Sequence, residues 1–264
     1  STKEYVSGFG INHKFKSLLK NINSEGTNSK KYKKDMQSEV LSILSYDVKL
    51  PLIKELDNNK KNYFTPKISI RHSPNKTKNV KEEARDLNTT NVFSLNRLGF
   101  NDNIEGGTSA TLGFDFSHQN EDGNDFLTKK IATIFREKED KNLPDTSTLG
   151  KKQSDIVGEI GFNASKNFLI NYNYSLDNDW DQVNLHNITN EFRINNFVNK
   201  FSFYEENNII GNKSYFENSF SYLFNGKNSL SFKTRENKKD NLTEFYNLIY
   251  EYKNDCLTAS IIYN

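Results

Sequence analysis

The sequence predicts an all-β protein, built as an antiparallel, up-and-down transmembrane β-barrel. Apolar and polar residues alternate with a period of two over long stretches, as they do in strands that have one apolar face. Short turn signals recur about every 30 residues in the second half of the chain, a spacing that fits two strands of about ten residues and two connections. These turns are Ser165–Lys166, Asn195–Asn196, Asn225–Gly226 and Asn254–Asp255.

The composition favours a barrel over a soluble domain with a thick core. Hydrophobic residues make up 34% of the 264 residues, and the mean hydropathy is -0.81, whereas soluble domains carry about 45–50% apolar residues. Disordered chains are also poor in apolar residues, but they contain few aromatics, and this chain has 20 Phe and 13 Tyr. A barrel needs only its outward face to be apolar. A soluble β-sandwich, a solenoid and disorder are the alternatives.

The first half of the chain shows less regular strands than the second. Proline at position 66 falls inside one of them, which suits an edge, a strand start or a bulge because proline donates no N–H. The expected strands cover 5–15, 40–50, 63–72, 112–118 and 126–136. The connections between and after them are a basic loop over 23–34, a polar loop over 75–90, a turn over 119–123 and a long loop over 140–152.

The second half carries the clearest alternation. Phe168, Ile170 and Tyr172 form one face of an expected strand, whereas Asn171 and Asn173 lie on the other. Strands of about ten residues match the transmembrane requirement, since globular strands are usually about five or six residues long. The chain is expected to hold about fourteen strands in all. Those of this half cover 156–164, 168–176, 188–194, 197–203, 216–224 and 246–252.

The connections of the second half fall into two classes. The tight turns hold two to four residues, whereas the loops over 177–182, 207–212 and 236–241 are longer and polar. In bacterial barrels the short turns face the periplasm and the long loops face outside. We therefore expect the turns at Ser165, Asn195, Asn225 and Asn254 to lie on the periplasmic side.

Charge and hydropathy exclude two classes of protein. The 36 basic and 34 acidic residues give a formal net charge of +2, and basic runs such as 30–34 fall in expected loops, so a nucleic-acid partner is not predicted. No run approaches 18 consecutive apolar residues, so no transmembrane helix is predicted.

Both ends interrupt strand-like sequence, and no signal peptide precedes the first strand. We therefore expect a fragment of a longer protein, forming a curved, open half-barrel.

No catalytic, cofactor or metal site is predicted. The four histidines are isolated from one another, and the chain has one cysteine, so a zinc site with two cysteine ligands is excluded. Asp177, Asp179 and Asp181 alternate through a loop and could bind calcium, but the glycine and the distal glutamate of an EF-hand loop are missing, so a solvated acidic loop is the simpler interpretation. No Gly-x-Ser-x-Gly elbow is present. An outer-membrane barrel enzyme with carboxylates facing the lumen stays an alternative, as does a generic porin or nutrient receptor.

The single cysteine, Cys256, follows the turn Asn254–Asp255 and should lie at the periplasmic rim. The periplasm is oxidising, and an exposed thiol there is normally paired. Its partner is then expected outside this sequence, on the missing part of the chain or on another chain.

Residues 91–114, NVFSLNRLGFNDNIEGGTSATLGF, resemble the most recognisable block of the LPS-assembly outer-membrane protein (LptD, OstA/Imp) family. The segment 63–71 is similar to the strand that precedes this block in the family, and 250–257 is similar to its C-terminal segment around a disulfide cysteine. The resemblance covers most of the chain. The matching positions of the block are Asn91, Phe93, Ser94, Asn96, Arg97, Asp102, Glu105, Gly106 and Gly113.

The resemblance implies an outer-membrane translocon component that inserts lipopolysaccharide (LPS) into the outer leaflet, not an enzyme. Residues 1–264 would form part of one C-terminal barrel, without the N-terminal periplasmic domain and the last strand. The implied partners are LPS, an LptE-like lipoprotein plug and, through the missing domain, the periplasmic LPS bridge. Cys256 would be the cysteine that bonds to the periplasmic domain, and the neighbouring Asp255 stands where some members carry a second cysteine.

Overall fold

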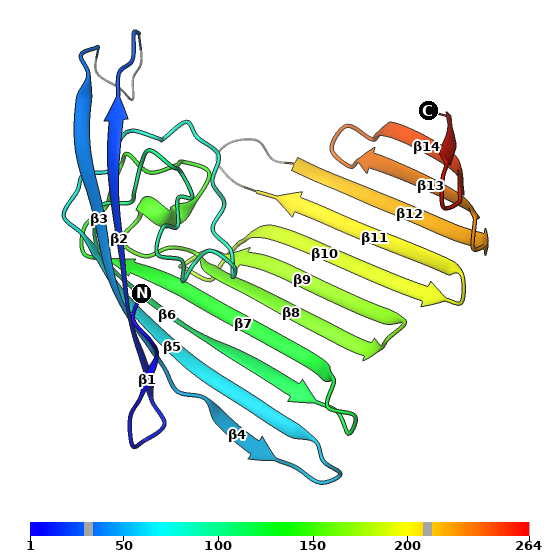
Figure 1. The fold of residues 1–264 in the computed structure, drawn as a ribbon, viewed down its shortest axis with the longest axis horizontal. Helices are drawn as coiled ribbons and strands as arrows, with labels where there is room; N and C mark the ends of the chain where they lie inside the picture. The colour runs from blue at the N-terminus through cyan, green and yellow to red at the C-terminus, as the bar shows by residue number, and fades with distance from the viewer. Residues whose placement is uncertain (29–33, 208–212, 264) are drawn as a thin grey trace.

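The computed structural model describes residues 1–28, 34–207 and 213–263 (Figure 1). Within these residues the chain forms one sheet of fifteen strands. The predicted loops over 23–34 and 207–212 lie partly outside the described residues. The strands are β1 (Tyr5–Val6), β2 (Asn12–Ser24), β3 (Gln37–Lys49), β4 (Leu52–Glu55), β5 (Lys61–Ser73), β6 (Gly107–Gln119), β7 (Asp125–Arg136), β8 (Ile156–Ser165), β9 (Phe168–Leu176), β10 (Val183–Ile194), β11 (Phe197–Glu206), β12 (Lys213–Asn225), β13 (Asn228–Asn237), β14 (Leu242–Lys253) and β15 (Thr258–Tyr263).

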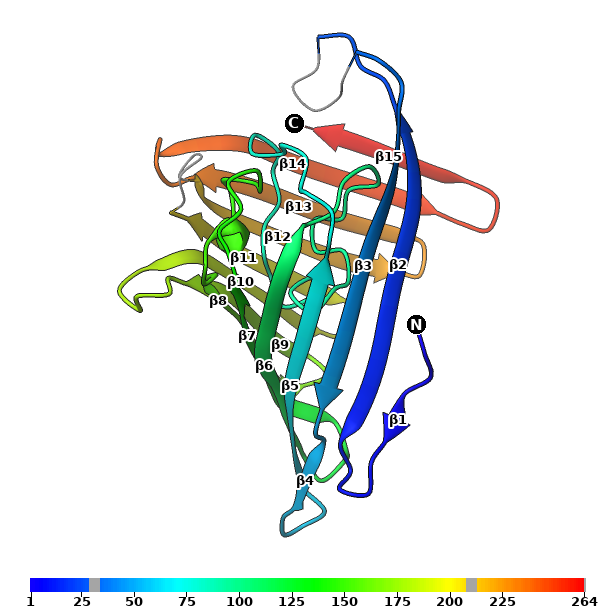
Figure 2. The ribbon, with the colours of Figure 1, turned by 90° about the vertical axis from the view of Figure 1, so that its left-hand side faces the viewer.

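The sheet has the predicted up-and-down order. Neighbouring strands of the sequence pair antiparallel, with one exception among the described strands: β3 pairs with β5 rather than with β4, and the short β4 pairs with the other part of the same edge of β5. No pairing joins β1 to β15 within the described residues. Figure 2 shows that the sheet curves strongly and stays open, as expected for part of a barrel wall. The described residues contain no helix with the length and apolar character needed to cross a membrane.

The prediction of one continuous strand over 5–15 is wrong. The chain turns back within it, because Ser7 donates its N–H to Ile11 O at 2.9 Å and Gly10 donates to Ser7 O at 2.9 Å. Gly10 has a φ of 76°, which glycine adopts without steric cost. A short β1 and the long β2 therefore replace one strand, and β2 continues beyond the predicted end to Ser24.

Pro66 lies in the interior of β5 and pairs with Phe114 of β6, so the predicted edge, strand start or bulge is not found there; on its other side the neighbouring ladder is interrupted. The β3 ladder on β5 ends at the pair Lys49–Lys67, and the β4 ladder begins at Leu52–Phe64. Leu50 donates its N–H to Pro66 O at 3.1 Å across the gap. The missing proline donor therefore coincides with an irregularity between two short ladders.

The two faces of the sheet differ in the way that the alternation predicted. Directly paired residues share a face, and pairs such as Ile70–Ala110 and Ile68–Leu112 belong to an apolar face on which Ile70 is 51% exposed. The opposite face carries cross-strand ion pairs, among them Lys130–Glu159 at 2.9 Å and Lys200–Glu191 at 3.1 Å. We call the apolar face the outer face and the polar face the inner face.

The connections separate into two ends of the sheet. The tight turns after β8, β10, β12 and β14 share one end with the turns over 56–60 and 120–124. The long connections over 74–106 and 137–155 extend from the other end and lie on the concave, inner side of the sheet (Figures 1 and 2). The second of these contains one turn of 3-10 helix, η1 (Thr148–Gly150), whose start is capped by Ser147 Oγ.

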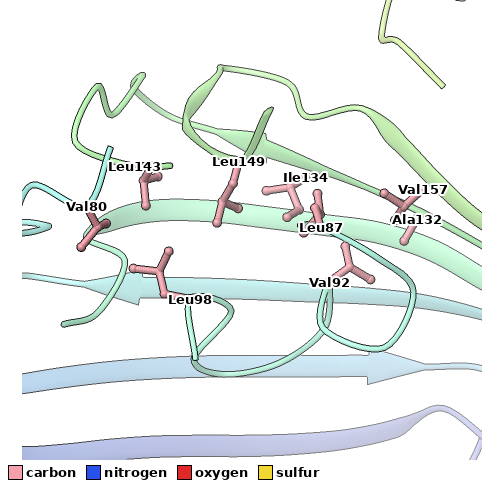
Figure 3. Close-up of a cluster of buried hydrophobic side chains, with 9 residues drawn as sticks. All are labelled: Val80, Leu87, Val92, Leu98, Ala132, Ile134, Leu143, Leu149 and Val157. Carbon is pink, nitrogen blue, oxygen red and sulfur yellow. The ribbon is translucent and has the colours of Figure 1, made fainter. Parts of the chain in front are cut away.

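These two connections, together called the loop block, supply much of the hydrophobic core. Figure 3 shows their apolar side chains packed against β7 and β8. A second buried cluster joins Ile104 of the block to Leu41 and Ile43 of β3. Loops that bury side chains in this way are fixed to the inner face rather than free above the rim. The first cluster comprises Val80, Leu87, Val92, Leu98, Ala132, Ile134, Leu143, Leu149 and Val157.

Candidate functional site

The loop block contains a buried carboxylate surrounded by arginines. Glu105 has no exposed surface, and Arg97, Arg71 and Arg136 are 1%, 3% and 7% exposed. Arg97 binds Glu105 with both arms of its guanidinium, from Nε to Oε2 at 2.8 Å and from Nη2 to Oε1 at 2.5 Å. Arg136 donates from Nη1 to Glu105 Oε1. Arg71 Nη1 lies 3.9 Å from the same oxygen. We call these four residues the Glu105 cluster.

The cluster joins the loop to three strands. Arg71 of β5 donates to the main-chain oxygens of Leu95 at 3.0 Å and Glu105 at 2.7 Å. Arg97 donates to two hydroxyl groups of β6, Ser109 Oγ at 2.6 Å and Thr111 Oγ1 at 3.2 Å. Charged groups taken out of water need this many partners, because a buried charge without them is costly.

The arginines determine the charge state of Glu105. Burial raises the pKa of this carboxyl group, but Arg97, Arg71 and Arg136 outweigh burial and hold the pKa below its ordinary value. Glu105 is therefore ionised at neutral pH. Three positive charges then meet one negative charge in the cluster, and Asp140 lies 3.9 Å from Arg136 Nη2 to add a second.

Two glycines of the predicted motif allow close approach of the main chain. A Cβ at Gly106 would collide with Asn75 O, and the N–H of Gly106 donates to Thr77 Oγ1 at 2.9 Å. A Cβ at Gly113 in β6 would collide with Ile131 O of β7. Glycine is required at both positions by space, rather than by an unusual backbone conformation.

The first part of the motif shapes the loop. Asn91 accepts from Asn88 N–H at 3.0 Å and donates to Asp86 O at 2.7 Å. Asn96 Nδ2 donates to Phe100 O at 3.0 Å. These are local side-chain to main-chain bonds of the kind that asparagine forms in turns.

The other motif residues lie at the edge of the block. The ring of Phe93 packs against the first hydrophobic cluster and lies 5.4 Å from Lys67 Nζ on the inner face. Ser94 donates its N–H to Asn91 O at 2.9 Å, and Asp102 is half-buried. The structure therefore brings Arg97, Glu105 and Gly106 together, whereas the remaining motif residues form the turns and contacts that hold this part of the loop in place.

Sequence reasoning missed Arg71, Arg136 and Asn75. Asn75 ties the loop to β3, where its Oδ1 accepts from Ser42 N–H at 2.8 Å and its Nδ2 donates to Val40 O at 2.9 Å. Arg71 follows Ser69 on the polar face of β5, and an arginine there looks like any lumen residue. Its full burial was the missing information, and strand alternation does not report what covers a face.

Cys256 lies in the turn between β14 and β15, at the end of the sheet that holds the tight turns. Its thiol is free and exposed. The turn is closed by Asn254, which donates its N–H to Leu257 O at 2.9 Å and accepts from Cys256 N–H at 2.9 Å. No group of three His, Cys, Asp or Glu side chains in the described part of the chain is arranged to hold a metal ion.

A family model described as "LptD: LPS transport system D" matches residues 7–234. The chain belongs to the LptD family. With its apolar outer face and polar inner face, it is an integral outer-membrane protein of an LPS transport system. The matched residues include the whole loop block and the Glu105 cluster.

Solved porin structures cover most of this chain. A triple mutant of the Rh. blastica porin shares 8% identity at a TM-score of 0.37, over 95% of this chain and 82% of the porin. A double mutant of the same porin shares 10% identity at a TM-score of 0.36, with the same coverage. No curated protein sequence matches the chain.

Proposed function

We propose that this chain forms part of the wall of the translocon that inserts LPS into the outer leaflet of the outer membrane. The observation that carries the proposal is a sheet with one apolar face and one polar face in a member of the LPS transport system D family. Its outer face presents large apolar side chains such as Leu44, which is 59% exposed. Its inner face presents hydroxyls, amides and ion pairs that suit sugar and phosphate groups.

The loop block has a defined part in this proposal. It fills the inner side of β5–β8 at the end of the sheet opposite the tight turns. With those turns toward the periplasm, the block lies at the outer rim, where LPS would leave the lumen. The Glu105 cluster then holds a rigid boundary at the exit rather than reacting with substrate, and the energy for transport comes from other components of the pathway.

Two kinds of protein partner belong to the proposal. The inner residues of β11 and β13 are open, since the side chains of Lys200 and Lys233 are 59% and 44% exposed. This open wall could receive an LptE-like lipoprotein plug. A periplasmic domain outside this sequence would connect the barrel to the LPS bridge proteins.

Cys256 supplies the covalent part of this connection in our proposal. Its exposure in a turn at the proposed periplasmic end suits a disulfide with a cysteine outside this sequence. The bond would hold the periplasmic domain against the barrel at the mouth through which LPS enters.

Depletion of the full-length protein in the cell that encodes it tests the function. Newly made LPS should fail to reach the cell surface and should accumulate on the periplasmic side, as measured by labelling of surface LPS in intact cells. Wild-type protein expressed from a plasmid should restore labelling. Normal surface LPS in depleted cells would contradict the proposal, and loss of a small solute flux without loss of surface LPS would instead indicate a porin.

A further inference from the structure

A second feature at the long-loop end of the sheet is an acidic cavity that is separate from the Glu105 cluster. Its volume is about 340 Å³, and its walls come from the loop block, from β9, β10 and β11, and from the connection between β9 and β10. Within the described part of the chain, its lining holds a single lysine, Lys151, against five carboxyl groups. These are Asp86, Asp145, Asp155, Asp177 and Glu206.

Asp155 is the most informative of these residues because it is buried with only neutral donors around its carboxylate in the described structure. It is 6% exposed. Its Oδ2 accepts hydrogen bonds from Ser175 Oγ at 3.0 Å and Asn184 Nδ2 at 2.8 Å, and both donors are neutral. Its Oδ1 is buried and accepts no hydrogen bond from the described residues. A buried carboxylate in this state calls for a further partner.

The neighbouring carboxyl groups add further negative charge. Asp145 pairs with Lys81 at 3.3 Å. Asp177 accepts the N–H of Asp179 at 2.9 Å in its own turn. Glu206 is 8% exposed and accepts from Tyr204 Oη at 3.2 Å. The charges converge from separate connections, so folding of the loop block brings like charges together.

We infer that this cavity binds a hydrated divalent cation, Mg²⁺ or Ca²⁺, with Asp155 as its direct carboxylate ligand. Hard divalent cations take oxygen ligands, and Mg²⁺ in particular keeps several waters while binding one or two carboxylates. No three carboxyl groups of the described residues are close enough to ligate one ion directly. The cavity has room for the retained waters, since a water occupies about 30 Å³.

The ion would join parts of the chain that are far apart in sequence. Asp86 comes from the first connection of the loop block, Asp145 and Asp155 come from the second, and Asp177 comes from the connection between β9 and β10. A bound cation would offset their mutual repulsion and stabilise the loop block against the rim. This inference concerns ion binding and stability, and it does not rest on the proposed transport of LPS.

Thermal unfolding of the purified full-length protein tests the inference. The protein in detergent is stripped with a chelator and heated in MgCl₂ or CaCl₂, with NaCl at the same ionic strength as the reference. Wild type should gain a saturable increase in Tm that NaCl does not produce, because a ligand of the folded state stabilises it by mass action. Asp155→Asn should lose most of that increase.

Two further variants make the test specific. Asp122→Asn changes an exposed acid in the turn at the opposite end of the sheet and should keep the full increase in Tm. Asp86→Asn changes an exposed residue of the cavity, so it should fold even if Asp155→Asn does not. Asp86→Asn should lower the affinity for the cation by about tenfold, as the loss of an outer-shell partner does. No divalent-specific increase in wild type, or unchanged cation affinity in the Asp155→Asn or Asp86→Asn protein, would overturn the inference.

Discussion

Replacing Glu105 by glutamine should release the loop block from the inner face. The substitution keeps the size of the side chain and removes the negative charge that Arg97, Arg71 and Arg136 surround. Glutamine offers one acceptor oxygen, whereas the carboxylate accepts from Arg97 at both oxygens and from Arg136 as well. The amide nitrogen of glutamine would also face guanidinium donors, so at least one buried donor loses its partner.

The size of the effect follows from the burial of the cluster. Removing one member of a buried ion pair costs about 3–5 kcal/mol, because the other member is left buried without compensation. Glu105 is 0% exposed, and all three arginines are less than a tenth exposed, so the full range applies. A change of about 3 kcal/mol raises the population of undocked loop by roughly a hundredfold. The strands keep their ladder hydrogen bonds, so we expect local opening before the sheet unfolds.

Trypsin digestion of outer-membrane vesicles measures this opening. The loop carries Lys81 and Arg85, and Arg85 Nε is held by Arg97 O at 2.8 Å in the closed loop. Cleavage there should be much faster in Glu105→Gln than in wild type. Glu191→Gln is the matched control, since Glu191 lies on the same inner face with a side chain 24% exposed and pairs with Lys200 of β11 rather than with the loop block, and pairs of this kind contribute about 1 kcal/mol or less. Equal protection of Glu105→Gln and wild type would show that the cluster does not hold the loop.

Three further changes have defined outcomes. Lowering the pH should loosen the loop block, because the folded protein holds the pKa of Glu105 below its ordinary value of 4.5. The contribution of Glu105 to the stability of the docked loop is then complete above pH 4.5 and is lost as the pH falls through the lower, folded-state pKa. Pepsin cleavage of the loop should rise below that pH in wild type, and a flat profile would exclude Glu105 as the cause. Gly106→Ala should destabilise the loop by a few kcal/mol, about as much as overpacking a core, because of the collision with Asn75 O, and trypsin protection equal to wild type would contradict it. Cys256→Ser should change the mobility of the intact protein on a non-reducing gel, and an unchanged mobility would contradict the proposed disulfide.

The sequence predicted those parts of the fold that repeat. Alternation assigned the faces of strands such as β9, because a strand that separates an apolar from a polar environment must alternate. The tight turns marked the ends of the hairpins, since Asn225 and Gly226 favour turn conformations. The error at the first strand has the same basis. The alternation of apolar and polar residues around Gly8 and Gly10 predicted a continuous strand, although two glycines so close together allow the chain to reverse.

The contacts of the candidate site were beyond prediction because they do not repeat. Arg136 and Glu105 meet across 31 positions of sequence, and this contact depends on the path of an irregular loop over the sheet. The motif indicated that Arg97 and Glu105 matter without saying that they face each other. The acidic cavity has the same origin, since its carboxyl groups come from loops and strand ends that only the folded sheet brings together.

Photo-crosslinking from the inner face during transport tests the proposed function most directly. A photoreactive residue in place of Ser219, on the inner face of β12, should form an adduct with LPS in cells that are actively exporting it, and the adduct should disappear when LPS synthesis stops. Thr234, on the outer face of β13, is the matched position facing lipid. Absence of an LPS adduct at the inner position, in a variant that still supports growth and normal surface LPS, would contradict passage of LPS along this wall.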